Sequence, residues 1–287
     1  MLVQSLLNAI CAGANCALLG MGFGLILSTA RLFHIAYGFV SISAVYITLS
    51  LGGTFFDSVI GIIVSGFIGV IIELSLYSPI RRSGAGHNRM LVLSLGVLIA
   101  GQSLLSLLFG DDVLSFDSSS LNNSFDILGA RLTQIQILTL IIGVGGCLTT
   151  TIALRLTSWG RTVAAVASDP YLAEALGLNV QVAILGAFFI GSILGGTAMT
   201  LLSIDTGLTP SLGFDVLFLG VATVVIAGVG KAHGLLISGI LISLAREAGG
   251  WWLSAYWQDV IVFTLLIGFL LVRPQGLFGH PISSKTS

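Results

Sequence analysis

The sequence has few charged residues: Asp, Glu, Lys and Arg together make up only 8% of its 287 residues. A soluble globular domain typically carries about 25% charged residues. Here 55% of the residues are hydrophobic and the mean hydropathy is +1.07, which excludes a soluble domain and places the chain in a lipid bilayer. The formal net charge of -1 identifies no charged partner, and nothing in the composition indicates nucleic-acid binding.

Cysteine and catalytic motifs are also scarce. The three cysteines, Cys11, Cys16 and Cys147, lie in apolar runs and fit small core residues better than a disulfide framework. No CxxC or Cys/His cluster indicates a metal site. The nearest approach to a phosphate-binding loop, "VVIAGVGKAHG", has Val225 where the first glycine of GxxxxGK is required. We therefore expect neither enzyme activity, nor a nucleotide site, nor a bound cofactor.

Long apolar runs dominate the chain. A helix needs about 20 mostly apolar residues to cross the hydrocarbon. Nine candidate runs occupy residues 5–28, 35–53, 57–79, 89–109, 133–155, 181–203, 213–229, 234–250 and 255–272. The residues before the first run, "MLVQ", lack the positive charge of a signal peptide. The prediction is an all-α integral membrane protein: one transmembrane domain over residues 1–287, a polytopic bundle of eight or nine helices, some short or broken.

Basic residues predict the orientation, because Lys and Arg accumulate in cytoplasmic loops. The polar loop 110–132 contains four Asp and a single Arg and is assigned to the outside. Alternation of the spans then puts nine of the eleven basic residues at cytoplasmic ends and leaves Arg131 and Arg246 outside. The N-terminus is thus expected outside, and the C-terminus and the loop 156–180 in the cytoplasm.

The cytoplasmic loop 156–180 contains the signals of a short helix. Asp169 suits the N-cap, Pro170 the first helical position, and Gly177 a left-handed C-terminal residue. Helices this short are marginal in water, so something must pack against its apolar side chains. Those side chains are Tyr171, Leu172, Ala175 and Leu176.

Two interpretations of this helix remain open. It lies on its own protein or on the membrane interface, or it docks a soluble cytoplasmic partner. In the second case Arg161, eight residues before the cap, anchors that partner, and Glu174 belongs to the docking helix.

Glycine, with 37 residues, is about twice as frequent as usual. GxxxG spacings such as Gly20–Gly24 and Gly191–Gly195 predict closely packed helices. Glycine also interrupts two runs, at "RLFHIAYGF" (31–39) and "IAGVGKAHGLL" (226–236). Broken spans in both halves indicate a translocation pathway. The candidate pathway residues are His34, Tyr37, Gly38, Gly228 and Gly230.

Ionisable residues in the runs lie within about two turns of a predicted span end, which disfavours proton coupling. They are Glu73, Asp215, Arg246, Glu247 and Asp259. Arg246 is expected to form a structural ion pair with Asp259 or Asp215, or to belong to an outer gate.

Three segments together resemble a known family. "GRTVAAVASDPYLAEALGLN", "AGVGKAHGLLISGIL" and "LLVRPQGLFG" are similar, in order and spacing, to signature regions of the permease subunits of branched-chain amino-acid ABC importers. The resemblance implies a multi-pass permease of a bacterial-type cytoplasmic membrane. Its implied partners are two cytoplasmic ATP-binding subunits that bind ATP and Mg²⁺, a second permease subunit and an external substrate-binding protein. The loop 156–180 then corresponds to the segment that couples the ATPase to the membrane spans.

The sequence departs from the family pattern at both breaks. The usual NFAHGE is replaced by "HIAYGF" (34–39), and Ala227 and Lys231 replace the more common Gly and Ser. The leading hypothesis is therefore an ATP-driven importer subunit for branched-chain or other neutral amino acids. The alternatives are a urea or short-amide permease of the same family, and an ATP-independent channel or facilitator for a small neutral solute.

Overall fold

A computed structural model describes residues 2–84, 86–116, 124–127, 130–230, 232–252, 257–273 and 275–278. Its helices are α1 (Leu2–Ala30), α2 (Tyr37–Leu51), α3 (Phe55–Ile72), the π-helical turn η1 (Glu73–Tyr77), α4 (Ser78–Arg82), α5 (His87–Phe109), α6 (Gln134–Leu156), α7 (Ser158–Ser168), α8 (Pro170–Ala175), α9 (Val180–Thr206), α10 (Leu212–Ala227), α11 (Ala232–Trp252) and α12 (Gln258–Val272). Strands β1 (Ser124–Ile127) and β2 (Ala130–Thr133) form an antiparallel hairpin.

The predicted all-α membrane bundle is confirmed. Helices α1, α2, α3, α5, α6, α9, α10, α11 and α12 coincide with the nine apolar runs. Five described helical stretches are long and apolar enough to cross a membrane. By contrast, α2, α10 and α12 have only 15 or 16 residues, fewer than the roughly 20 needed for a full crossing. The prediction of short spans is therefore also confirmed.

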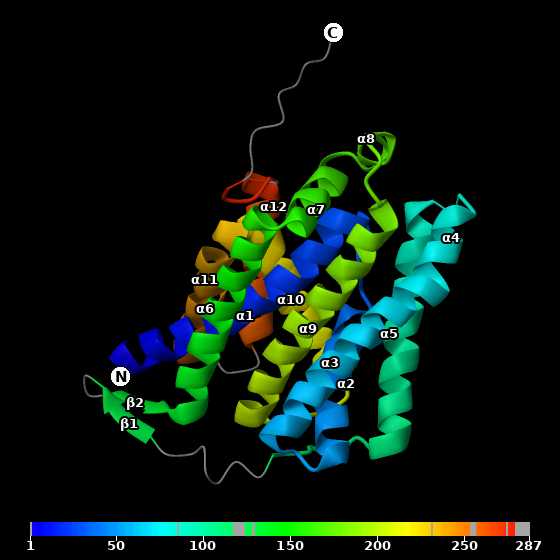
Figure 1. Ribbon diagram of the computed structural model, residues 1–287. Coiled ribbons are helices and arrows are strands. Elements are labelled where there is room, and N and C mark those ends of the chain that lie inside the picture. The colour runs from blue at the N-terminus through cyan, green and yellow to red at the C-terminus, as the bar shows by residue number, and fades with distance from the viewer. Residues whose placement is uncertain are drawn as a thin grey trace.

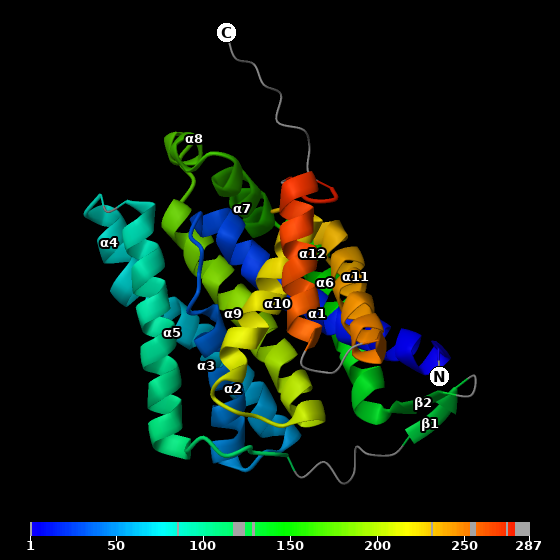
Figure 2. The same cartoon turned by 180° about the vertical axis from the view of Figure 1, so that it is seen from behind.

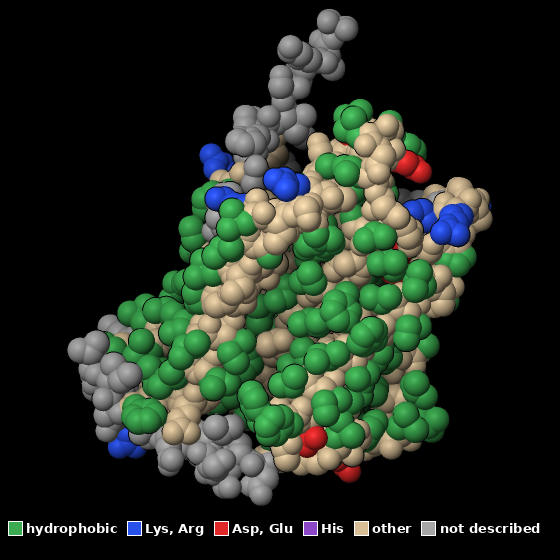
Figure 3. All heavy atoms as spheres, viewed as in Figure 1, with side chains coloured by type: hydrophobic (Ala, Val, Ile, Leu, Met, Phe, Trp, Pro, Cys, Tyr) green, Lys and Arg blue, Asp and Glu red, His purple; other side chains and the backbone are tan. Residues whose placement is uncertain are grey.

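The helices run between two ends of the molecule, as Figures 1 and 2 show. Helices α4, α7 and α8 lie at one end, together with the last turn of α12; we call it the α8 end. The β1–β2 hairpin and the first turns of α1 lie at the other end, which we call the hairpin end. Between them, hydrophobic side chains form a broad belt, and in this view most Lys and Arg side chains gather near the α8 end (Figure 3).

Helix α1 is the central helix of the bundle. It packs against α6, α9, α10 and α11. In its most apolar stretch 78% of the residues are buried, against 17% in α6. Helices that face lipid need little surface buried within the protein. The buried shares therefore place α1 in the core of the bundle and α3, α5 and α6 at its periphery.

Small residues allow the close helix packing that the GxxxG spacings predicted. A Cβ atom added at Gly191 of α9 would lie 2.7 Å from the carbonyl oxygen of Gly22 in α1. Gly24 faces Val224 of α10, while Gly195 faces the Tyr37 hydroxyl of α2. In lipid, such packing between backbones drives helix association.

Two loops contain more structure than the sequence predicted. The polar loop 110–132 includes the hairpin, whose strand β2 is fastened to α1: the side chain of Gln4 donates to the carbonyl of Arg131 (2.8 Å) and accepts from its N–H (2.8 Å). The loop 156–180 contains α7 in addition to the expected short helix. Thr157, whose hydroxyl accepts from the N–H of Gly160 at 3.0 Å, begins α7.

Candidate functional site

Helix α7 is anchored in the bundle at the α8 end. Its Val163 and Val166 are 4% and 0% exposed and pack in one cluster with Leu25 of α1 and Ala183 and Ala187 of α9. This apolar contact fixes α7 against two long helices. A displacement of α7 would therefore act on α1 and α9 directly.

Helix α8 is capped at both ends by flanking residues, as predicted. The carboxylate of Asp169 accepts from the N–H groups of Tyr171 (2.9 Å) and Leu172 (3.1 Å), and Pro170 occupies the first turn. At the other end Gly177 has φ = +80°, and its N–H and that of Leu178 donate to the carbonyls of Glu174 and Ala173. This is a Schellman motif. The helix has six residues.

The large apolar side chains of α8 and its C-cap are not covered by the described part of the chain. Ala173 is buried against α7 and α9, but Tyr171 is 83% exposed, Leu172 59% and Leu176 71%. Arg161 and Glu174 are exposed at the same end. Among the described residues of α8, Ala173 is the buried one and supplies the packing predicted for this helix.

Arg31 ties the end of α1 to the end of α7. Its Nη2 donates to the carbonyl oxygens of Ala167 (3.2 Å) and Ser168 (2.7 Å), the last turn of α7. A cation suits the negative end of a helix. Among the described residues Arg31 is the only one other than glycine with a positive φ, +51°. The backbone therefore turns sharply here, directly before the first break.

The first break places His34 in a buried polar network. Nδ1 of His34 lies 3.0 Å from the hydroxyl of Tyr77, which donates to Oγ of Ser94 (2.8 Å). That Oγ also accepts from the N–H of Ala36 (2.9 Å). Since the Tyr77 proton is used toward Ser94, Nδ1 of His34 is the donor to Tyr77. Nε2 is then an acceptor, buried and without a partner among the described residues.

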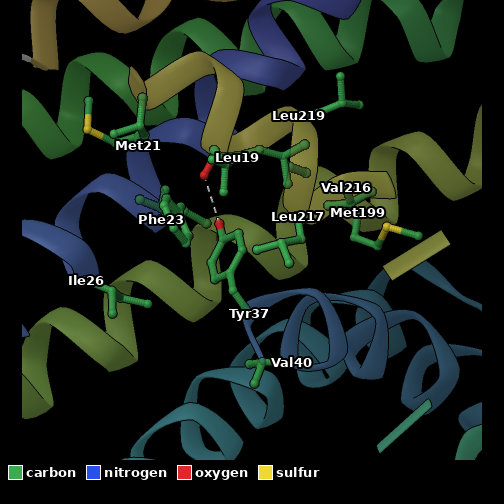
Figure 4. Packing of buried hydrophobic residues seen from close by; sticks show 14 of the residues in the cluster. Leu19, Met21, Phe23, Ile26, Tyr37, Val40, Met199, Val216, Leu217 and Leu219 are labelled. Atoms are coloured by element: carbon green, nitrogen blue, oxygen red, sulfur yellow. Dashed lines mark hydrogen bonds between the residues drawn. The ribbon is translucent and has the colours of Figure 1, made fainter. Parts of the chain in front are cut away.

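Tyr37 and Gly38 lie in close helix contacts. The Tyr37 hydroxyl donates to the carbonyl of Leu19 at 3.0 Å, within the core of α1, α2, α9 and α10 drawn in Figure 4. A Cβ atom at Gly38 would collide with the carbonyl of Gly213 at the start of α10. These two residues hold the first break against α1 and α10.

The second break is covered by the chain's "GLF" segment. Gly228 ends α10 with φ = +97°. The N–H groups of Leu277 and Phe278 donate to the carbonyls of Ile226 (2.7 Å) and Ala227 (3.2 Å), which the broken helix leaves free. Part of the family-like motif 270–279 thus caps α10. Lys231 lies outside the described residues.

A cavity of about 330 Å³ lies between the second break and α7. Gly228 and Gly230 line it together with Gly160, Val163 and Ala164 of α7, and α1 and α6 complete its wall. The structure thus brings two of the five candidate pathway residues beside the anchored face of α7. His34, Tyr37 and Gly38 are buried elsewhere.

Sequence reasoning missed three residues. Tyr77, the partner of His34, and Ser94, the partner of Tyr77, lie in two other apolar runs, where a lone Tyr or Ser resembles an ordinary span residue. The π-helical turn η1 positions Tyr77, and such turns are frequent at functional sites. From the sequence, Arg31 is only a basic residue at a predicted span end. Its position directly before the break was the available signal.

A solved structure resembles this arrangement. PsaBC from Streptococcus pneumoniae, in complex with a Fab, matches with a TM-score of 0.56 at 15% sequence identity, over 96% of this chain and 93% of the PsaBC chain. At this identity the likeness bears on the fold alone.

Relatives of known family match the chain along its whole length. It is 28% identical to the permease protein LivH of Escherichia coli K12 and 27% identical to LivH of Salmonella typhimurium, and each match covers 99% of this chain and 97% of the relative. BraD of Pseudomonas aeruginosa is 28% identical with the same coverage. All three are named high-affinity branched-chain amino acid transport system permease proteins.

The family described as the permease component of branched-chain amino acid transport systems matches residues 5–270. The matched range includes both breaks and the α7–α8 segment. The chain therefore belongs to this family of permease components.

Proposed function

We propose that this chain is the membrane-spanning permease subunit of an ATP-driven importer and moves a branched-chain or other neutral amino acid by alternating access. Members of its family are transport subunits and not enzymes. ATP and Mg²⁺ bind to two separate cytoplasmic subunits in this proposal. A second permease subunit and an external binding protein complete the transporter.

The observation that carries the proposal is that α8 is capped and anchored but has exposed apolar side chains. The helix is closed by Asp169 and by Gly177, and α7 fixes it to the bundle, yet Tyr171, Leu172 and Leu176 are exposed. A rigid helix with uncovered apolar side chains beyond the membrane belt fits a partner's groove. It does not fit a helix that lies on its own protein.

Charge distribution supports a cytoplasmic α8 end. The ends of α1, α4, α6 and α12 at this side carry basic residues: Arg31, Arg81, Arg82, Arg155 and Arg273. The positive-inside rule assigns such an end to the cytoplasm. The hairpin end and the first turns of α1 then face outward, and α12 leads the chain back to the cytoplasm.

Motion can pass from α8 to the pathway through described contacts. Val163 and Val166 of α7 pack against α1 and α9, and Arg31 links α7 to the first break. The second break and α7 line the same 330 Å³ cavity, so a displacement of α7 changes the shape of that cavity. When ATP closes the partner subunits, α8 moves with them. Displacement of α7 then changes the packing at both breaks and reverses the side to which the pathway opens.

We infer the class of solute from the names of the relatives. Those that match over 99% of this chain are named for branched-chain amino acids, and we assign the same class here. Urea or a short amide remains the alternative solute within this family, and an ATP-independent facilitator is the alternative mechanism.

Reconstitution tests the proposal. The chain is co-expressed with the permease, ATP-binding and binding proteins encoded beside it, and the purified complex is placed in liposomes. Uptake of labelled leucine should require ATP inside, the binding protein outside and this chain. ATP-independent flux through liposomes that contain only this chain would support a facilitator, and ATP-driven uptake of urea but not leucine would replace the solute.

A further inference from the structure

A second cavity, at the hairpin end, is polar and takes no part in the contacts described above. Its volume is about 180 Å³, several times the roughly 30 Å³ of one water in the liquid. Four helices contribute polar side chains to it. These are Asn8 and Asn15 of α1, Gln136 and Thr139 of α6, Asp205 of α9 and Glu247 of α11.

The positions of these residues along α1 make the cavity a deep one. Asn8, Ala12 and Asn15 are spaced by four and three residues, so they share one face of the helix. Asn15 lies seven residues further into the bundle, about 10 Å at 1.5 Å per residue. Near the mouth, Oδ1 of Asn8 accepts from Gln4 at 3.1 Å and from Gln136 at 3.5 Å.

Both carboxylates lack a cation. Within the described part of the chain neither Asp205 nor Glu247 has an ion-pair partner. The neighbouring Arg246 pairs instead with Asp259 of α12, Nη2 to Oδ1 at 3.6 Å, which confirms the ion pair expected from the sequence. Glu247, the next residue of α11, lines the cavity, and Arg246 is not among the lining residues.

The deepest group also lacks a partner. Asn15 is 5% exposed, and its Oδ1 is buried without a hydrogen-bond partner among the described residues. A buried acceptor left without a hydrogen bond is destabilising. An acceptor at the inner end of a cavity with two carboxylates indicates a ligand that donates hydrogen bonds and carries positive charge.

A primary ammonium group meets these conditions better than a metal ion. It brings three N–H donors and one positive charge. No group of three or more His, Cys, Asp or Glu side chains that could hold a metal occurs among the described residues.

We infer that this cavity binds the α-ammonium group of the transported amino acid on its outward-facing side, with Asp205 and Glu247 supplying charge and Asn15 accepting a hydrogen bond. The inference rests on the proposed function for the identity of the ligand. It assigns the cationic end of the solute to α1, α6, α9 and α11.

Thiol labelling of the whole complex in liposomes tests the inference. Ala12 lines the cavity, whereas Leu6 lies on the same helix, 51% exposed, outside it. Ala12→Cys and Leu6→Cys are made with the native cysteines changed to alanine (Cys11→Ala, Cys16→Ala, Cys147→Ala). Each is labelled with aminoethyl methanethiosulfonate, a cation, and with sulfonatoethyl methanethiosulfonate, an anion.

Clefts lined by one sign of charge raise the arrival rate of counter-ions by about tenfold or more. The cation-to-anion ratio of labelling rates at Ala12→Cys should thus exceed that at Leu6→Cys by about tenfold. Adding Asp205→Asn and Glu247→Gln should abolish the difference. Leucine and 3-methylbutylamine should slow labelling at Ala12→Cys, while 4-methylpentanoate, which lacks the amine, should not.

Equal ratios at the two positions, protection by 4-methylpentanoate, or protection by Na⁺ alone would overturn the inference. Leucine uptake by the same liposomes separates the two claims. Normal ATP-driven uptake without protection rejects only the ammonium site, whereas protection by the amine without uptake of any amino acid rejects the proposed function.

Discussion

Arg31, the residue after α1, donates from Nη2 to the carbonyl oxygen of Ser168, the last residue of α7, at 2.7 Å. This hydrogen bond joins the central helix to the residue that precedes the cap of α8. The two residues are 137 positions apart in the sequence. The same nitrogen also donates to the carbonyl oxygen of Ala167 at 3.2 Å, and these two are the described hydrogen bonds between the first break and the α7–α8 segment.

Arg31→Ala should weaken coupling. Hydrogen bonds from charged groups contribute about 1.5–3 kcal/mol, and exposure reduces this toward about 1 kcal/mol. The complex should still assemble and hydrolyse ATP, but leucine uptake per ATP should fall. The measurement is the ratio of uptake to hydrolysis in liposomes. Arg89→Ala, which removes another exposed arginine at the α8 end, is the control. Equal ratios in both variants would contradict a role for this contact.

Tyr171→Asp combined with Leu172→Asp should prevent association with the ATP-binding subunits. The substitutions place two charges on side chains that are 83% and 59% exposed, so the fold of the permease should survive while the docking surface is lost. Co-purification of the ATP-binding subunits with the permease from the membrane fraction measures this association. Val113→Asp, at a 68% exposed apolar residue of the hairpin end, should leave association intact. Wild-type yield of ATPase with the double variant would refute docking at α8.

Gly177→Ala should destabilise the end of α8. The left-handed conformation costs a residue with a Cβ about 1–2 kcal/mol, here at φ = +80°. Amide hydrogens of residues 171–178 should exchange roughly fivefold faster or more, since 1 kcal/mol changes an equilibrium by that factor. Asparagine adopts this conformation more readily than alanine, so the exchange rates in Gly177→Asn should lie between those of the wild type and those of Gly177→Ala. If alanine and glycine gave the same exchange rates, the Schellman motif would have no energetic role.

The ion pair of Glu73 and Arg81 should show strong coupling. Two hydrogen bonds of 2.9 and 3.3 Å join them, and Glu73 is fully buried. Arg81→Ala leaves a buried carboxylate without its partner and should cost about 3–5 kcal/mol. Glu73→Gln with Arg81→Met should restore most of the thermal stability measured in detergent. A double variant no more stable than Arg81→Ala alone would show that the two residues act independently.

The sequence was sufficient for the features that depend on local chemistry. Apolar length predicted the span helices, and the Asp169, Pro170 and Gly177 signals predicted α8, because caps and left-handed turns are made by adjacent residues. The ion pair of Arg246 with Asp259 was predictable for another reason: the two residues lie at the same level of consecutive spans.

Features that join distant segments were not predictable in this way. His34 meets Tyr77, 43 positions away, and Tyr77 meets Ser94, 60 positions from His34, only after α2, α3 and α5 have packed. The polar cavity likewise collects one or two polar residues from each of four helices. Its members are ordinary in sequence, and only the packing around α1 brings them together.

The central claim is that α8 projects into the cytoplasm and is covered by an ATP-binding subunit. It is tested by Tyr171→Cys in the cysteine-free chain, labelled with a membrane-impermeant maleimide. We predict labelling in inside-out vesicles stripped of the ATP-binding subunits, protection when those subunits are added back, and no labelling in sealed right-side-out vesicles. Labelling of right-side-out vesicles would contradict the account, because α8 would then lie on the opposite side of the membrane from any ATPase.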